Sequence, residues 1–267
     1  VGELACGILS RIHNEINGGE PFSDFEQLDD FDIDRAVLVA PVLRMLYSDG
    51  TSEAVVKFEC SRALLDYDTS VKSLTPDHIV YTKASQLVLS SDVCEEGIIS
   101  EFKAFTEKNG YKPRIVIVKG LGIFACGKNA KEAETAREVF VDAVKIAYFA
   151  KAFGGVKPMT PDLIDFIVNW EVESYRSKVS LAVGSGKRLE GKIVIVTGGA
   201  QGFGKGIADA MAAEGANIVI ADMNADGAEK AAREYGVHGY SVAANVTDED
   251  SVKNMIDRTV LAFGGLD

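Results

Sequence analysis

The chain has 267 residues, of which 47% are hydrophobic and 25% are charged. This is enough apolar material for one large or two medium domains, and the composition is typical of a globular protein. A formal net charge of −12 argues against a nucleic acid or an anionic membrane surface as partner, because both would repel the protein. We therefore expect a small-molecule substrate, no nucleic acid and no membrane.

The cysteines favour a cytoplasmic protein, and the apolar runs indicate no membrane span. The four cysteines are far apart and form no C-x-x-C pair, so neither a disulfide framework nor a zinc knuckle is indicated. The longest apolar run, residues 36–46, is too short to cross a bilayer as a helix. Because the first residue is Val1 and the final Gly-Gly-Leu-Asp is typical of the beginning of a strand, we expect truncation at both ends.

Helical and extended patterns alternate in the first part of the chain. Two segments have apolar residues at helical spacing, residues 34–47 and 95–108. Four short segments have the apolar pattern of strands, residues 55–59, 79–81, 114–118 and 123–126. These elements predict a sheet with covering helices.

Two further helices are predicted before the chain changes character. Residues 129–153 have a long amphipathic pattern that ends at Gly154 and Gly155. Thr160 and Pro161 are typical of an N-cap and a first helical residue, and we expect that helix to continue through Trp170 toward Ser177. Residues 181–188 contain Gly-Ser-Gly and have the composition of a linker. We therefore divide the chain into residues 1–180, the linker 181–188 and residues 189–267.

From residue 189 the pattern is strand, glycine turn, helix, strand, helix, strand, helix. Residues 193–196 and 217–221 are continuous apolar runs, as in parallel strands covered on both faces. A helix over residues 206–214 is stopped by Gly215, and the last helix is expected to begin with Thr247 as its cap. This order predicts an α/β fold whose last part is the first half of a Rossmann doubly wound parallel sheet.

The strongest chemical signal is Thr197-Gly-Gly-Ala-Gln-Gly-Phe-Gly204, which follows an apolar strand and opens a helix. Gly198 permits a tight turn, Gly202 lets the backbone approach a pyrophosphate, and Gly204 lets the helix pack closely on the strand. Backbone amides and the positive end of the helix dipole attract the anion. The setting of strand, turn, helix and strand predicts a nucleotide site.

Asp222 favours NAD as the nucleotide. It ends the second strand about 20 residues after the turn, where a carboxylate accepts hydrogen bonds from ribose hydroxyls and repels a 2′-phosphate. Neither Ala200 nor Gln201 is basic, and Met223 follows the aspartate, so no evident cation would hold NADP. The alternative interpretation of Asp222 is a solvated residue at a strand end.

This glycine turn, together with Asp222 and Asn245-Val-Thr, resembles the amino-terminal half of a short-chain dehydrogenase/reductase. In that family an aspartate that contacts adenine usually stands where this chain has Asn245, so the position keeps its polarity and loses its charge. The resemblance and the pattern together identify ten candidate cofactor-binding residues: Thr197, Gly198, Gln201, Gly202, Phe203, Gly204, Asp222, Met223, Asn245 and Val246.

The catalytic residues that the resemblance implies do not occur in this sequence. The family carries an Asn-Asn-Ala-Gly segment after the fourth strand, then a serine and a tyrosine–lysine pair four residues apart. Tyr148 and Lys151, like Tyr175 and Lys178, are three residues apart and precede the glycine turn, so we interpret them as ordinary helix residues. We expect the chain to bind a nucleotide and to carry no catalytic residue of its own.

Residues 1–180 resemble, more loosely, the rear of a class II aldolase/adducin-like domain, as in fused proteins of the rhamnulose-1-phosphate aldolase/alcohol dehydrogenase type. Three segments carry this resemblance: residues 74–81, residues 118–127 with the following helix, and residues 165–176. Class II aldolases use zinc held by histidines. Here Leu121 precedes Gly122, where the resemblance implies a histidine, so we expect a degenerate aldolase-like region and no metal site.

The histidines reinforce this expectation. The chain has three, His13, His78 and His238, and no two are close in sequence. His78 is the one tempting ligand, and we interpret it as a solvated or hydrogen-bonded histidine at a strand edge. Metal ligands of an aldolase would then lie upstream of Val1.

Three hypotheses about function remain open. The leading one is a fragment of a fused sugar-metabolising enzyme, a homo-oligomer, whose dehydrogenase half uses NAD to oxidise a small hydroxyl compound or aldehyde. The second is a non-catalytic nucleotide-binding or scaffold protein. The third is a zinc-dependent sugar-phosphate aldolase whose ligands lie outside this sequence. We also expect residues 193–196 to form an open sheet edge, because the fourth strand would pair there.

Overall fold

The computed structural model describes residues 7, 10–11, 14, 23–48, 53–169 and 187–267. We call the described residues up to 169 the first unit and residues 189–267 the second unit. The helices of the first unit are η1 (Ser23–Phe25), α2 (Ile33–Tyr47), α3 (Arg62–Leu65), α4 (Pro76–Thr82), α5 (Glu95–Asn109), α6 (Ala130–Ala150), η2 (Lys151–Phe153) and α7 (Pro161–Asn169). Its strands are β1 (Val55–Glu59), β2 (Leu87–Leu89), β3 (Ile115–Val118) and β4 (Gly122–Gly127).

The four strands of the first unit form one sheet in the order β1-β4-β3-β2. β4 lies antiparallel to both β1 and β3, and β2 is parallel to β3. Every residue of β3 and β4 is buried, because α2 and α5 pack on one face of the sheet and α6 on the other. The predicted sheet with covering helices is confirmed, and the structure adds the short strand β2.

The sequence-based strand at residues 79–81 is wrong, because this segment belongs to helix α4. Thr75 caps the helix by accepting a hydrogen bond from the backbone N–H of His78, and Pro76 occupies the first helical position. The Thr-Pro-Asp start signal therefore outweighs the β-branched residues that follow it. The same signal was interpreted correctly at Thr160, where α7 begins at the next residue.

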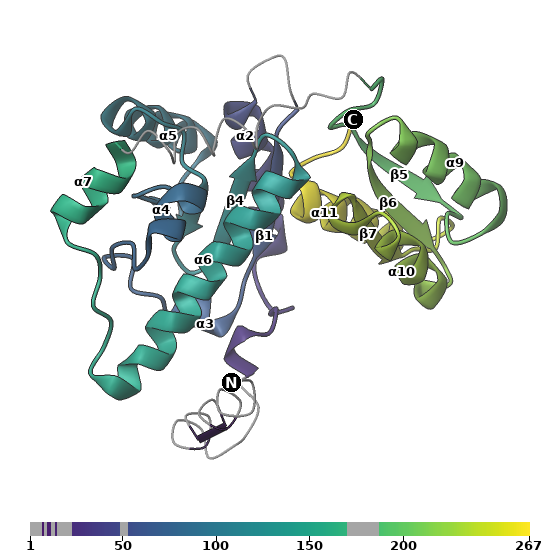
Figure 1. Cartoon of the computed structure of the whole chain (residues 1–267). Coiled ribbons are helices and arrows are strands. Elements are labelled where there is room, and N and C mark those ends of the chain that lie inside the picture. The colour runs from purple at the N-terminus through teal and green to yellow at the C-terminus, as the bar shows by residue number, and fades with distance from the viewer. Residues whose placement is uncertain (1–6, 8–9, 12–13, 15–22, 49–52, 170–186) are drawn as a thin grey trace.

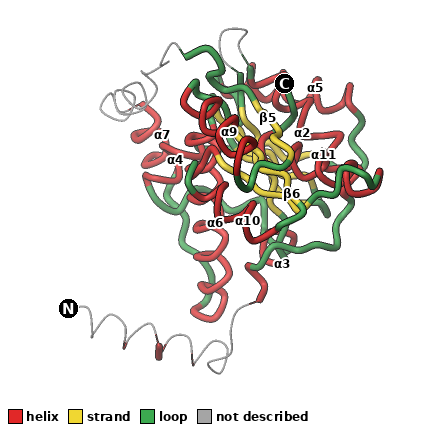
Figure 2. The backbone as a smooth tube through the Cα atoms, turned by 90° about the vertical axis from the view of Figure 1, so that its right-hand side faces the viewer, coloured by secondary structure: helices red, strands yellow, loops and turns green. Residues whose placement is uncertain are grey.

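The second unit is a three-stranded parallel sheet in the order β5-β6-β7. Its strands are β5 (Ile193–Thr197), β6 (Asn217–Asp222) and β7 (Gly239–Ala243), and its helices are α9 (Gly202–Ala213), α10 (Ala225–Arg233), η3 (Gly236–His238) and α11 (Glu249–Phe263). Ile218 and Ile220 face α9 and α10, while Val219 and Ala221 face α11. This arrangement confirms the predicted first half of a Rossmann sheet, with β5 at an edge, and Figure 2 views it from the side of α9 and α10.

Two predicted helix starts in the second unit differ from the structure. α9 begins at Gly202, four residues before the expected position, because the glycines of the turn are themselves part of its first turn. α11 begins at Glu249 with Asp248 as N-cap, so Thr247 is not the cap. The hydroxyl group of Thr247 instead donates to Asn245 Oδ1 at 2.8 Å.

Helix α11 lies between the two units (Figure 1). Val260 and Leu261 are buried with residues of α2 and β1, whereas Met255 and Phe263 are buried against the second sheet. Most of the predicted linker lies outside the described residues, as do Trp170 and Ser177, so the boundary at residues 181–188 stays a prediction. Among the described helices, none is both long and apolar enough to cross a membrane.

Candidate functional site

The glycine turn joins the end of β5 to the start of α9, at the carboxyl edge of the second sheet. Gly198 has φ +65°, which side chains rarely adopt, and its N–H donates to the carbonyl oxygen of Ala221 at 2.8 Å. A Cβ atom on Gly204 would lie only 2.1 Å from the carbonyl oxygen of Gly198. The third glycine is therefore required, although it lies against the turn itself and not against the strand as the motif suggested.

Gly202 opens the helix toward free space. Its φ is +61°, and a Cβ atom added there would have nothing within 4 Å. Gln201 is the N-cap residue and makes no side-chain hydrogen bond to the first turn. The amides at the start of α9 are therefore not capped by that side chain, and an anion could approach them closely.

Asp222 connects the end of β6 to the turn. Its Oδ2 accepts from the backbone N–H of Ala200 at 3.1 Å, and its Oδ1 accepts from the N–H of Asn224 at 3.0 Å. These bonds use one lone pair on each oxygen, and an ionised carboxylate has about four acceptor sites. The side chain thus has a structural role and retains acceptor capacity toward a ligand, so neither interpretation of Asp222 excludes the other.

The end of β7 places Asn245, another candidate residue, at the same edge of the sheet. Ala244 N–H donates to the carbonyl oxygen of Asp222 at 3.0 Å, which places Asn245 beside the end of β6. Asn245 Oδ1 accepts from both the N–H and the hydroxyl group of Thr247, at 3.1 and 2.8 Å. In the described part of the chain no bond uses Asn245 Nδ2, so that group is the donor the side chain can offer to a base.

Three apolar side chains among the candidate residues are exposed. Phe203 is 96% exposed, Met223 is 76% exposed and Val246 is 61% exposed. Thr197 and Gln201 are also exposed. All ten candidate residues lie at or just after the carboxyl ends of β5, β6 and β7.

The sequence-based set omitted Gly199 and Ala200, which the structure places in the turn. A Cβ atom on Gly199 would lie 2.8 Å from the carbonyl oxygen of Val196 and 3.1 Å from Ile220 Cδ1. The backbone N–H of Ala200 binds Asp222. The pair of adjacent glycines could have predicted the close packing at Gly199. No local pattern predicts the hydrogen bond between Ala200 and Asp222.

The lysine nearest to the turn in sequence is already paired. Lys205 Nζ lies 3.0 Å from Glu234 Oε2, is also paired with Asp209, and lies over the Tyr235 ring. Hydrogen bonding to Asp209 raises the pKa of Lys205, against a smaller opposing effect of burial. The charge of Lys205 is thus paired with carboxylates of α9 and of the end of α10.

The tyrosine–lysine pair at Tyr148 and Lys151 lies in the first unit, at the end of α6. The Tyr148 hydroxyl group donates to Asp24 Oδ2 at 2.7 Å, and Lys151 Nζ lies 5.9 Å from the centre of the Tyr148 ring. This pair is part of the packing of η1 against α6. Tyr175 and Lys178 lie outside the described residues.

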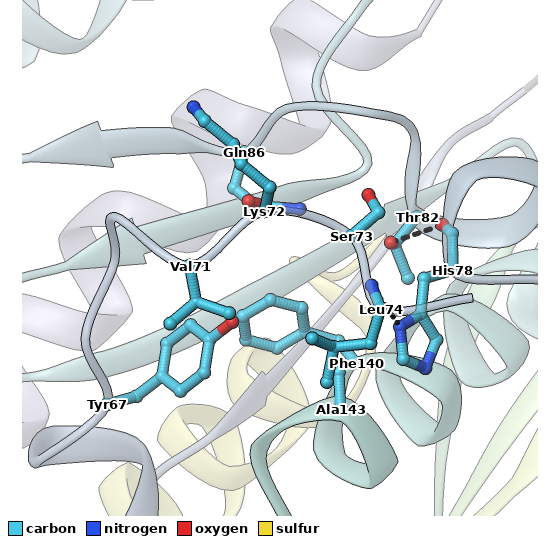
Figure 3. Close-up of a pocket in the computed structure, with 10 residues that line it drawn as sticks. All are labelled: Tyr67, Val71, Lys72, Ser73, Leu74, His78, Thr82, Gln86, Phe140 and Ala143. Atoms are coloured by element: carbon cyan, nitrogen blue, oxygen red, sulfur yellow. Dashed lines mark hydrogen bonds between the residues drawn. The ribbon is translucent and has the colours of Figure 1, made fainter. Parts of the chain in front are cut away.

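His78 is buried and hydrogen-bonded, at the edge of a small recess between α4 and α6 (Figure 3). Its Nδ1 accepts from the backbone N–H of Leu74 at 3.3 Å. The recess has room for about one water molecule, close to 10 Å³, and Ser73 Oγ is buried there without a partner among the described residues. The predicted hydrogen-bonded histidine is confirmed, on a helix and not at a strand edge.

The other residues considered for a metal site lie in other parts of the fold or outside the described residues. His13 lies outside the described residues, and His238 lies in η3 of the second unit. Leu121 is buried in the core formed with α2 and α5. Within the described part of the chain, no three histidine, cysteine or acidic side chains are grouped so that they could hold a metal ion.

Comparisons with known families match the two units separately. Residues 192–267 match the family model of short chain dehydrogenases, and residues 106–176 match the second domain of class II aldolases. One polypeptide therefore carries a segment that matches short chain dehydrogenases and a segment that matches class II aldolases, as the resemblances implied.

One relative matches nearly the whole chain, and another matches about a third of it. The uncharacterized oxidoreductase YuxG of Bacillus subtilis (strain 168) is 26% identical over 298 residues, which cover 97% of this chain and 42% of the relative. The uncharacterized oxidoreductase MT0793 of Mycobacterium tuberculosis (strain CDC 1551 / Oshkosh) is 51% identical over 82 residues, which cover 30% of this chain and 33% of the relative. The chain thus spans less than half the length of these relatives.

A solved structure also matches part of the chain. The 3-ketoacyl-(acyl-carrier-protein) reductase from Brucella melitensis, complexed with NADH, is 38% identical over a match that covers 29% of this chain and 32% of that chain, with a TM-score of 0.29.

Proposed function

We propose that the second unit binds NAD and forms the cofactor-binding half of an oxidoreductase of the short-chain dehydrogenase type. The observation that carries this proposal is the meeting of the open glycine turn with Asp222 at the carboxyl edge of a parallel sheet. The match of residues 192–267 to short chain dehydrogenases and the NADH bound by the Brucella reductase support it.

The residues of the turn fit a dinucleotide. Open space at Gly202 and the uncapped amides of α9 suit a pyrophosphate, and the acceptor capacity left on Asp222 suits ribose hydroxyls. Asn245 Nδ2 would donate to the adenine, between the exposed side chains of Met223 and Val246. When bound, NAD supplies the hydride acceptor; the residues of this chain bind and orient it.

NAD is preferred to NADP on electrostatic grounds. A 2′-phosphate would lie beside the Asp222 carboxylate and be repelled by it, and Lys205 is held by Asp209 and Glu234. The substrate proposed for the whole protein is a small hydroxyl compound or aldehyde, derived from a sugar. The aldolase-like first unit is what favours a sugar.

Calorimetric titration of the chain with NAD, and separately with NADP, tests the proposal. Saturable binding that is tighter for NAD is expected, and Gly202→Val should abolish it, because a side chain at φ +61° strains the turn and fills the space left for the pyrophosphate. Gly206→Ala is the matched control, since Gly206 lies in the same helix and a Cβ atom there meets nothing within 4 Å. No binding by the folded chain, or equal loss in both variants, would contradict the proposal.

A further inference from the structure

The two units share apolar cores, although different families match them. Val260 and Leu261 of α11 are buried in the core that contains α2 and β1 of the first unit. In the other direction, Val55 of β1 and Ala130 and Ala133 of α6 are buried with the strands of the second unit. Each core is therefore incomplete without side chains of the other unit.

The end of α11 approaches β1 closely. Gly264 ends this helix with φ +93°, and a Cβ atom there would lie 2.9 Å from Val56 Cβ and 3.1 Å from the Val56 nitrogen. Lys57 Nζ lies 5.7 Å from the centre of the Phe263 ring. No larger residue at position 264 fits this backbone contact without movement, so the docking of α11 on β1 is close-packed.

A chain of polar contacts continues this junction to strand β5. Arg44 of α2 is 9% exposed; its Nη2 lies 2.7 Å from Asp267 Oδ2, and its Nε donates to the carbonyl oxygen of Ala54 at 2.9 Å. The same Asp267 Oδ2 accepts from the backbone N–H of Ile193, the first residue of β5, at 2.9 Å. A residue of the first unit thus reaches the beginning of the strand whose other end is the glycine turn.

We infer that the two units form one cooperative folding unit, in which Arg44 and Asp267 hold strand β5 and thereby support the glycine turn. Arg44 lies at the amino end of β5, whereas the glycine turn lies at its carboxyl end. Arg44 is therefore a positioning residue, which acts on the turn through the strand. Among the described residues, removing Arg44 leaves the partly buried Asp267 carboxylate with only the longer ion pair to Lys192, at 3.7 Å, and removing Asp267 leaves Arg44 with only its ion pair to Glu53, at 3.6 Å, so either change is destabilising. Shared cores transmit that loss to both units, because neither can unfold without exposing apolar surface of the other.

Hydrogen exchange of the full chain, measured by mass spectrometry at increasing sub-denaturing guanidinium concentrations, tests this without any nucleotide. Peptides covering α2 and β1 report on the first unit, and peptides covering β5 and β6 report on the second. We expect the two sets to converge on the same free energy of opening. Opening of β5 and β6 at a clearly lower denaturant concentration than α2 and β1 would overturn the inference.

Variants at the junction sharpen the test. Arg44→Met should speed exchange of both sets by the same factor, roughly tenfold or more, and Asp267→Asn should act in the same direction if Arg44→Met does not fold. Arg62→Met is the matched control, because Arg62 is an exposed arginine on α3 of the first unit, and it should leave both sets unchanged. Faster exchange confined to α2 and β1 in Arg44→Met would refute the coupling.

One arm of the test rests on the proposed function. Saturating NAD should slow exchange of α2 and β1 by the same factor as β5 and β6, since a ligand of one part stabilises the whole cooperative unit. If NAD slows exchange only in the second unit, the coupling fails. If NAD slows exchange nowhere, the proposed cofactor fails, and the denaturant series still decides the coupling.

Discussion

The backbone N–H of Ala200 donates to Asp222 Oδ2 over 3.1 Å, which joins the glycine turn to the end of strand β6. One carboxylate thereby shapes the loop proposed to hold the pyrophosphate and stands where the ribose is proposed to bind. The ordering of the turn and the choice of nucleotide are thus assigned to a single side chain, and substitutions can separate these two roles.

Asp222→Asn should change nucleotide selectivity more than it changes the fold. The amide keeps one acceptor oxygen for Ala200, loses the acceptor for the Asn224 N–H and removes the negative charge. The preference for NAD over NADP should therefore fall roughly tenfold, or by about 1.4 kcal/mol. Asp222→Ala removes the acceptors as well and should also weaken NAD binding. Titrations of both variants with both nucleotides measure this, and a selectivity ratio that stays at the wild-type value in Asp222→Asn would contradict it.

Gly204→Ala should destabilise the second unit. The added Cβ atom would lie 2.1 Å from the Gly198 carbonyl oxygen, so the turn must shift, at a cost of about 1–3 kcal/mol in the free energy of unfolding. Gly206→Ala in the same helix should instead stabilise by about 0.5–1 kcal/mol, because alanine favours the helix and the space is open. Chemical denaturation compares the two, and similar changes for both variants would show that the close contact is absent.

Glu134 should make part of the free energy of unfolding depend on pH in the acid range. Burial raises the pKa of Glu134, but hydrogen bonds from Arg137 and Lys57 outweigh this and lower the pKa from 4.5 to about 2. Because the folded pKa is depressed, the contribution is complete above pH 4.5 and is lost as the pH falls toward 2.

We expect about 1–3 kcal/mol of unfolding free energy to disappear over that window, and Glu134→Gln to flatten this part of the curve. Glu138→Gln, an exposed position in the same helix, is the control and should keep the wild-type slope. Denaturation at a series of pH values provides the measurement. A slope in Glu134→Gln identical to that of the control would argue against the paired carboxylate.

His78 should make the free energy of unfolding depend on pH at higher values than Glu134 does. Burial lowers the pKa of His78 below its ordinary 6.5, against the opposing charges of Asp77 and Asp142. The unfolded chain therefore binds the proton more tightly, and stability declines as the pH falls below 6.5. Protonation would also remove the acceptor at Nδ1 that binds the Leu74 N–H.

The variant His78→Asn offers an acceptor that does not titrate, so its stability should change less than that of the wild type between pH 7 and pH 5. The His78 ring resonances, followed by NMR over the same range, give the pKa directly. A midpoint at or above the ordinary value would contradict the assigned environment.

Local signals in the sequence determined most elements and the place of the candidate site. The apolar run before Thr197, the glycine spacing and the run that ends at Asp222 predicted the parallel sheet and its carboxyl edge, because each is a property of neighbouring residues. Asn129 and Gly154 likewise mark the two ends of the long helical segment α6–η2. Where two local signals competed, at residues 75–82, the capping signal prevailed over β-branched residues and the predicted strand was wrong.

Only the tertiary structure decided which distant residues meet. Three contacts join residues that are 22 to 223 positions apart in sequence. They are the pairing of β1 with β4, the hydrogen bond between Ala200 and Asp222, and the contact of Arg44 with Asp267. Such contacts depend on the sum of many burial and packing energies over the whole chain, and no short pattern encodes that sum. The sequence by itself therefore determined where a nucleotide is proposed to bind. The tertiary structure decided which residue of the first unit, Arg44, contacts Asp267 at the opposite end of strand β5.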